Sequence, residues 1–195
     1  MENKKYLYAL DLAMGNTGVA IFDLDTGDLI KVTSISTAIT NKTGLKKNPN
    51  HNNPNMIMGI KLKHIQDKFN ELRESYPPEK VIIEEGFTRF NKSTQVVFRV
   101  HGIAHLTFYD VENIYYTSTN VKKFIFNDGK ASKEDLSKII TKRLGYTFAN
   151  EDESDAVALG LTYFIKNNII KWKINAETPT KKKKKKKKKT KKEES

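Results

Sequence analysis

Carboxylates stand at three separate places in the chain, two of them at the ends of apolar runs, where a buried charge is costly. Asp11 ends one apolar run and Glu84 ends another, while Asp152 and Asp155 open a segment with helical periodicity. A charged side chain at the end of a buried strand is costly unless it binds a proton or a metal ion. The chain is therefore constrained to a fold that brings these places together, as an oxygen-rich pocket suited to Mg²⁺ or Mn²⁺.

The charge of the chain indicates what such a pocket acts on. Two divalent ions about 4 Å apart activate a water and stabilise the leaving oxygen in phosphodiester cleavage. The net charge of +12 favours nucleic acid as the phosphodiester. Residues 179–195 contribute +9 of this charge through eleven Lys and two Glu, so the rest of the chain carries only +3.

Each of these carboxylates also has an ordinary explanation. Asp11 alone would be a turn or cap residue, but the chain returns at once into a strand, which places Asp11 on a central strand. Side-chain alternation lets only one of Glu84 and Glu85 face the same cleft, and the buried run favours Glu84. Asp152 and Asp155 project from one side of a helix, within reach of one metal ion. The alternative for this pair is an acidic first turn favoured by the helix dipole.

Hydrophobic periodicity predicts five strands and five helices. The strands are expected over 5–13, from 19, and over 29–36, 81–84 and 113–117, and the helices over 56–74, 91–109, 120–126, 133–144 and 152–167. Residues 14–18 are predicted as a tight turn whose two glycines permit positive φ, and residues 25–28 as a hairpin turn. The order of elements predicts an α/β fold: a mixed five-stranded sheet flanked by helices on both faces.

The lysine-rich end of the chain marks a boundary near Ala176. We expect one domain over residues 1–176 and a disordered tail over 177–195, because a run of lysines cannot bury apolar area. The tail would be a nonspecific phosphate-binding arm or a nuclear-type address, or alternatively a low-complexity expansion with little role. Without a signal peptide or a membrane-length apolar run, we expect an intracellular protein with no membrane partner, located wherever its nucleic-acid substrate is.

Cysteine and histidine narrow the chemistry further. The chain has no cysteine, which excludes disulfides, thiolate zinc sites and cysteine nucleophiles. His101 and His105 have the spacing of a two-histidine zinc helix but lack the glutamate that follows the first histidine there. They are therefore expected to be histidines of a helix surface or an interface.

Three segments carry the carboxylates: Asp11-Leu12-Ala13-Met14-Gly15-Asn16-Thr17-Gly18, Ile83-Glu84-Glu85-Gly86-Phe87 and Asp152-Glu153-Ser154-Asp155-Ala156-Val157-Ala158. In order and spacing, over roughly residues 5–168, they resemble the motifs of the RuvC family of Holliday-junction resolvases, in a divergent viral or phage-like branch. Leu12-Ala13 stands where bacterial relatives have Pro-Gly, and Glu85 stands where they have Gln. These departures favour activity on branched DNA in general over sequence-specific cleavage.

The resemblance implies an RNase H-like fold, a homodimer, and two Mg²⁺ or Mn²⁺ ions per active site. The metal-binding carboxylates would be Asp11, Glu84, Asp152 and Asp155. Lys133 opens its helix as the family's catalytic-site lysine does, and Lys122 looks like a second one that stabilises charge on the scissile phosphate. Lys123 and Lys130 are also candidates for this second position. The alternative for each of these lysines is a solvated side chain on a helix face.

The resemblance also implies contacts with DNA and with a second subunit. Phe87 stands where the family has an aromatic residue near the junction centre, and its ring would stack on an unstacked base. Alternatively, Phe87 is a core residue, or Phe90 and not Phe87 stacks on the base. Further contacts with DNA would come from Lys122, Lys123 and Lys130. The step Val100-His101-Gly102-Ile103 resembles the family's dimer-forming helix, where glycine lets two helices approach closely.

The expected function is therefore a metal-dependent, structure-selective DNA endonuclease that resolves four-way junctions in recombination and repair, leaving 5′-phosphate ends. A two-fold dimer would place one active site on each of two opposed strands. The alternatives are a non-catalytic protein that binds branched or single-stranded DNA, and an RNA-directed nuclease of the same fold. An actin-like ATPase shares the Asp…Gly-x-Thr-Gly turn but needs two such domains for its nucleotide cleft.

Overall fold

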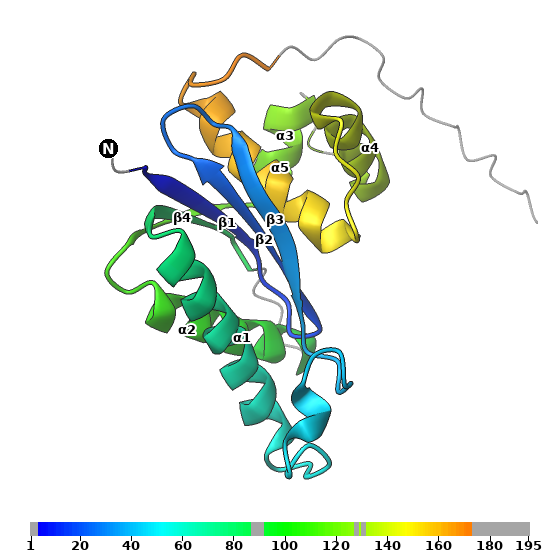
Figure 1. The fold of residues 1–195 in the computed structure, drawn as a ribbon. Coiled ribbons are helices and arrows are strands. Elements are labelled where there is room, and N and C mark those ends of the chain that lie inside the picture. Colours follow the sequence, from blue (N-terminus) through cyan, green and yellow to red (C-terminus); the bar gives the residue numbers. More distant parts are fainter. Residues whose placement is uncertain (1–3, 87–91, 127–128, 130–131, 173–195) are drawn as a thin grey trace, which may run out of the picture.

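The structure is a computed structural model that describes residues 4–86, 92–126, 129 and 132–172. Five strands form one sheet: β1 (Tyr6–Asp11), β2 (Asn16–Asp23), β3 (Leu29–Ser36), β4 (Pro78–Glu84) and β5 (Glu112–Tyr116). Their order across the sheet is β3-β2-β1-β4-β5 (Figure 1). The first three strands are antiparallel, while β4 runs parallel to β1 and β5 parallel to β4. The predicted mixed five-stranded sheet is confirmed, with β1 at its centre.

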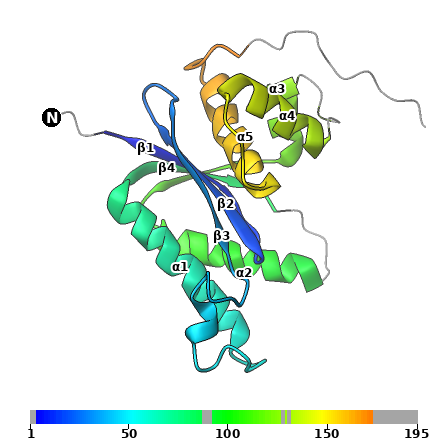
Figure 2. The same cartoon turned by 45° about the vertical axis from the view of Figure 1, so that its right-hand side comes forward.

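Helices cover both faces of this sheet. One face is covered by α1 (Ile57–Ser75) and α2 (Lys92–Thr107), and the other by α3 (Ser118–Phe126), α4 (Lys133–Leu144) and α5 (Glu151–Lys166) (Figures 1 and 2). A short 3₁₀ helix, η1 (Leu45–Lys47), lies in the loop before α1. Within the described residues, no helix is both long enough and apolar enough to cross a membrane. The boundary predicted near Ala176 and the tail lie outside the described residues.

Residues of β1 alternate between two hydrophobic cores. Leu7 and Ala9 pack in the core beneath α3, α4 and α5, whereas Tyr8 and Leu10 pack in the core beneath α1 and α2. All four side chains are fully buried, because the central strand has helices on both of its faces. The parity of a residue in β1 therefore decides which of the two layers it faces.

The structure corrects one prediction about the first loop. Residues 14–18 were predicted as a tight turn that uses positive φ at its glycines, but β2 already begins at Asn16. Among the described glycines, positive φ occurs at Gly27, Gly44 and Gly145, and not at Gly15 or Gly18. Gly27 fits the hairpin turn predicted over 25–28, whereas Gly18 is needed for a different reason, which concerns α5.

Candidate active site

Asp11 and Glu84 end two neighbouring parallel strands. Leu10 pairs with Ile83 in the register of β1 and β4, so the next residue along each strand is one of these carboxylates. The carboxyl ends of parallel strands meet at one edge of a sheet, where ligand sites are typically found. Both carboxylates share the parity of the core residues that face α5. Asp11 and Glu84 therefore lie at the same sheet edge and on the same face.

Alternation along β4 also separates the two adjacent glutamates. Ile82 packs in the core on the α5 face and Ile83 in the core on the α1 face, so Glu84 follows Ile82. Glu84 is half-buried, whereas Glu85 is exposed and its backbone N–H donates to the Tyr116 carbonyl at 2.9 Å. The structure thus places Glu84, and not its neighbour, beside the helices of this face.

The first turn of α5 supplies the third group of carboxylates. Asn150 caps the helix by accepting a hydrogen bond from the Glu153 backbone N–H at 3.0 Å. Asp152 accepts a hydrogen bond from the Asn16 side-chain amide at 2.5 Å, which links α5 to the start of β2. One helical turn later, Asp155 is half-buried and points into a pocket.

The start of α5 lies very close to the sheet because β2 carries a glycine there. A Cβ atom on Gly18 would lie 2.0 Å from the backbone oxygen of Asp152, a distance at which the helix would have to move. Gly18 is also the residue of β2 that pairs with Asp11. The absence of a side chain at this one position therefore lets the acidic turn of α5 approach the strand that ends in Asp11.

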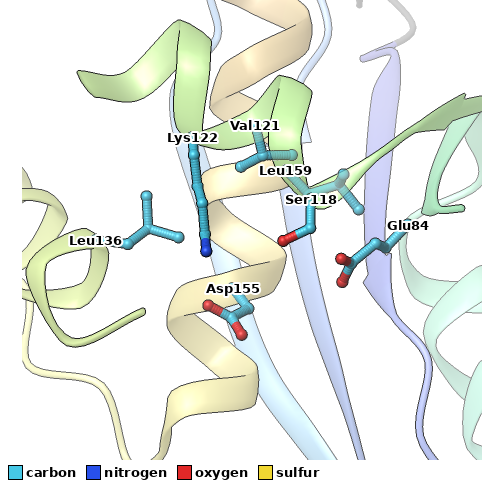
Figure 3. A pocket seen from close by; sticks show the side chains of 7 residues that line it. All are labelled: Glu84, Ser118, Val121, Lys122, Leu136, Asp155 and Leu159. Atoms are coloured by element: carbon cyan, nitrogen blue, oxygen red, sulfur yellow. The ribbon is translucent and has the colours of Figure 1, made fainter. Parts of the chain in front are cut away.

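A small pocket brings residues from four elements together. Its polar lining consists of Glu84 from β4, Ser118 and Lys122 from α3, and Asp155 from α5, and its apolar lining of Val121, Leu136 and Leu159. Figure 3 shows the polar ends of these four side chains gathered in the same space, with the Lys122 ammonium directed toward Asp155. Two carboxylates and one ammonium group thus converge against an apolar wall.

The chemistry of this pocket fits a hard divalent cation. Mg²⁺ takes oxygen ligands, commonly one or two carboxylates, and completes its shell with waters and substrate phosphates. Glu84 and Asp155 supply such a pair. Among the described residues, no group of three or more histidine, aspartate or glutamate side chains stands close enough to hold a metal ion. The side chains as placed therefore match a pair of ligands and not a closed four-carboxylate cage.

The predicted basic and aromatic residues fall in different places. Lys122 is half-buried and lines the pocket, whereas its neighbour Lys123 is exposed on α3. Lys133 begins α4, as predicted, but its side chain lies outside what the structure describes. Phe87 and Lys130 also lie outside the described residues.

Two polar residues of the site were not predicted from the sequence. Ser118 lines the pocket, and Asn16 binds Asp152. Ser118 comes two residues after the end of β5, which runs parallel to β4, so its position at the shared carboxyl edge was the available signal. The hydrogen bond of Asn16 joins residues far apart in the chain, and neither spacing nor periodicity points to it.

Comparisons with known proteins relate the chain to one family. The family model described as "Crossover junction endodeoxyribonuclease RuvC" matches residues 29–163. RuvC of Brachyspira hyodysenteriae is 31% identical over 114 residues, which cover 56% of this chain and 70% of that relative. RuvC of Neisseria meningitidis serogroup C is 24% identical over 163 residues, covering 82% of this chain and 84% of the relative.

Solved structures with this fold include resolvases from two further organisms. The structure of Thermus thermophilus RuvC superposes with a TM-score of 0.64 at 18% identity and covers 84% of this chain and 96% of its own. The yeast mitochondrial Holliday junction resolvase has a TM-score of 0.50 at 12% identity, covering 85% and 82%. At these identities the likeness shows the fold, and it confirms the predicted RNase H-like architecture. The family model matches well over half of the residues of this chain, and the chain therefore belongs to the RuvC family of crossover junction endodeoxyribonucleases.

Proposed function

We propose that this protein is a divalent-metal-dependent endonuclease that resolves four-way DNA junctions, with its active centre at the pocket of Glu84 and Asp155. The observation that carries the proposal is the convergence of these two carboxylates with Lys122, from three different elements, at the carboxyl edge of the sheet. The names of the related proteins support the reaction type, because they describe crossover junction endodeoxyribonucleases.

Once metal binds, four carboxylates would hold it: Glu84 and Asp155, which already share the pocket, and Asp11 and Asp152, whose side chains would turn toward that pair. When bound, two Mg²⁺ or Mn²⁺ ions would supply an activated water and a stabilised leaving 3′ oxygen, which gives 5′-phosphate ends. Asn16 holds Asp152 in place through its amide, as the outer partners of metal ligands do. Glu84 and Asp155 share one pocket and would be the first to share an ion.

Positive side chains near the pocket would bind the phosphates. The Lys122 ammonium lies beside Asp155 and would stabilise negative charge that develops on the scissile phosphate. Lys133 remains a second candidate because it begins α4, which also contributes Leu136 to the pocket. Lys123, Lys130 and Phe87 are proposed to contact the DNA, and the lysine-rich tail over 177–195 to add nonspecific attraction.

A homodimer is proposed to form through the outer face of α2. The exposed fractions of Phe98, Leu106 and Tyr109 are 44%, 61% and 80%. The spacing of Phe98, Gly102 and Leu106 puts them on one side of α2, and Tyr109 follows the end of the helix. A Cβ atom on Gly102 would meet nothing within 4 Å, so this part of the surface is open to another helix. Large exposed apolar side chains in a row are typical of protein interfaces. A four-way junction has near two-fold symmetry, which a two-fold dimer matches.

Cleavage assays on three matched substrates test this function. The full chain is incubated with a labelled four-way DNA junction, a linear duplex of the same sequence, and an RNA junction, each with Mg²⁺ and with a chelator. We expect paired nicks in the DNA junction with Mg²⁺ alone. Tight junction binding without nicks would favour the non-catalytic binding protein, and preferential cleavage of the RNA would favour the RNA-directed nuclease.

A further inference from the structure

The loop that joins β3 to α1 belongs to an unusually basic part of the chain. Residues 29–66 contain six lysines and no aspartate or glutamate. Half of these lysines, Lys42, Lys46 and Lys47, stand in the loop over residues 38–56, which we call the basic segment, and all three are exposed. The same segment holds six asparagines.

The basic segment has a defined conformation. Leu45 is only 7% exposed in the lining of a hollow between η1 and α1, and Thr43 donates a hydrogen bond from its hydroxyl to the Ala38 carbonyl at 2.6 Å. The side chains of Asn48 and Asn53 accept hydrogen bonds from backbone N–H groups two residues later. Two of the asparagines thus stabilise turns, and the lysines project from a segment that is held in place by hydrogen bonds and by the buried Leu45.

The residue that precedes the basic segment is hydrogen-bonded to the loop that follows β1. Thr37 is fully buried, and its hydroxyl donates to the Met14 carbonyl at 2.5 Å while its backbone N–H donates to the Gly15 carbonyl at 3.0 Å. Met14 and Gly15 lie in the loop that directly follows Asp11. Figures 1 and 2 show the segment, in cyan, beside the start of α1, where β3 ends. The segment therefore extends the molecule at the same end of the sheet as the carboxylates.

We propose that the basic segment is a second DNA-contacting surface, which holds the phosphate backbone of a duplex arm beyond the cleavage pocket. Three exposed lysines without any nearby acidic residue in sequence complement a polyanion. Lysine and amide groups contact phosphates without reading bases, so this surface would position the substrate and not select a sequence. This inference rests on the proposed function, because the arm belongs to the junction that the pocket would cleave.

The composition of the surface favours nucleic acid over a protein partner. Among the described residues of the basic segment, Met56 is the one exposed large hydrophobic side chain. Protein interfaces and membrane-binding helices need larger apolar patches, such as the one on α2.

Salt-dependent binding of a four-way DNA junction tests the proposal. The test variant of the full chain combines Lys42→Ala, Lys46→Ala and Lys47→Ala. The control variant combines Lys4→Ala, Lys5→Ala and Lys171→Ala, which removes the same charge from exposed positions before β1 and after α5, at the opposite end of the sheet. Thermal unfolding of each variant checks that the fold is kept.

Each lost phosphate contact lowers the slope of log affinity against log salt concentration by about 0.9. If all three lysines contact phosphates, the magnitude of the slope is about 2.7 smaller for the test variant than for the wild type. Between 50 and 200 mM salt, the fold-loss of affinity of the test variant is then about 40 times smaller than that of the wild type. We also expect a higher KM for junction cleavage with an unchanged kcat, since the segment is placed outside the pocket. The control variant should stay within about one unit of the wild-type slope.

Equal slopes for the test and control variants would overturn the proposal and leave a protein partner as the occupant of this surface. The proposed function fails separately, if the wild type binds junctions but never nicks them. The binding slopes still decide the role of the basic segment in that case, because they do not depend on cleavage.

Discussion

At the scale of single residues, Lys122 and Lys123 are neighbours on α3 in different surroundings. Lys122 lines the pocket beside Asp155, whereas Lys123 is exposed. We predict that Lys122→Ala lowers the single-turnover rate of junction nicking by about 10²- to 10³-fold, because a charge that stabilises the transition state is lost. Lys123→Ala should leave this rate near that of the wild type and act on KM alone. Equal losses of rate in the two variants would contradict the assignment of Lys122.

His101 gives the stability of the protein a dependence on pH. Burial, and secondly the nearby His105, lowers the pKa of His101 below its ordinary value. The unfolded chain takes up this proton near pH 6.5 and the folded chain only at lower pH. The stabilisation is therefore fully present above about pH 6.5 and is lost as the pH falls through the folded pKa. The pKa of His64 is lowered as well, mainly by burial, and adds a change of the same sign.

Denaturant unfolding between pH 7.5 and pH 5, at a fixed protein concentration, measures this effect. The free energy of unfolding of the wild type should decline over this range, and that of His101→Gln should decline less steeply. His51→Gln, in the loop before α1, is the matched control and should follow the wild type. An unchanged decline in His101→Gln would show that burial of this imidazole does not couple folding to protons.

The sequence made part of the site predictable at this scale. Strand alternation chose Glu84 over Glu85, and the structure places Glu84 in the pocket and Glu85 in solvent. The spacing of Asp152 and Asp155 placed both on one helix, but the hydrogen bond from Asn16 to Asp152 could not be read from spacing. Contacts between distant segments depend on how closely the elements pack, which local patterns do not encode.

At the scale of elements, the packing of α5 on β2 depends on two glycines. A Cβ atom on Gly18 would meet the backbone of Asp152 at 2.0 Å, and one on Gly160 would meet the ring of Phe22 at 2.2 Å. Phe22 is fully buried and packs against Phe164, so its ring has little room to move. Glycines at both contacts hold the helix that carries the acidic turn close to the sheet.

Gly18→Ala should therefore destabilise the protein and disturb the site together. Overpacking of this kind costs about 1–3 kcal/mol, and the displaced α5 would carry Asp152 and Asp155 away from the strand ends. Gly15→Ala is the matched control, because a Cβ there meets nothing within 4 Å, and it should change stability by less than about 0.5 kcal/mol. Denaturant unfolding and junction nicking measure the two effects. Equal stability of the two variants would show that the close approach of α5 to β2 does not require a glycine at position 18.

The elements themselves were largely predictable, because their periodicities are strong. The helix over 133–144 was predicted with the bounds of α4, whose capping serine at 132 and C-terminal Gly145 mark both ends. β4 begins at Pro78, three residues before the predicted strand, since a proline is tolerated at the first position of a strand. The role of the glycines in 14–18 was wrong because a glycine needed for close approach looks, in sequence, like a glycine needed for a turn.

At the scale of the whole molecule, a charge on the outer face of α2 should change the oligomeric state. Leu106→Glu would place a charge in the centre of the proposed dimer interface, and we expect a monomer in sedimentation velocity at micromolar concentration. Leu144→Glu, at an exposed position at the end of α4, is the matched control and should remain a dimer. If the Leu106→Glu variant remained a dimer, another surface would join the subunits.

The pocket of Glu84 and Asp155 is the proposed site of DNA cleavage. The test measures nicking of a labelled four-way DNA junction in Mg²⁺ by Glu84→Gln and Asp155→Asn, with Glu85→Gln as the matched control. Junction binding is measured on the same samples. These changes keep side-chain shape and remove one charge each. We predict that the first two variants bind the junction but no longer nick it, while Glu85→Gln nicks like the wild type. Wild-type nicking by Glu84→Gln and Asp155→Asn would show that the active site lies elsewhere.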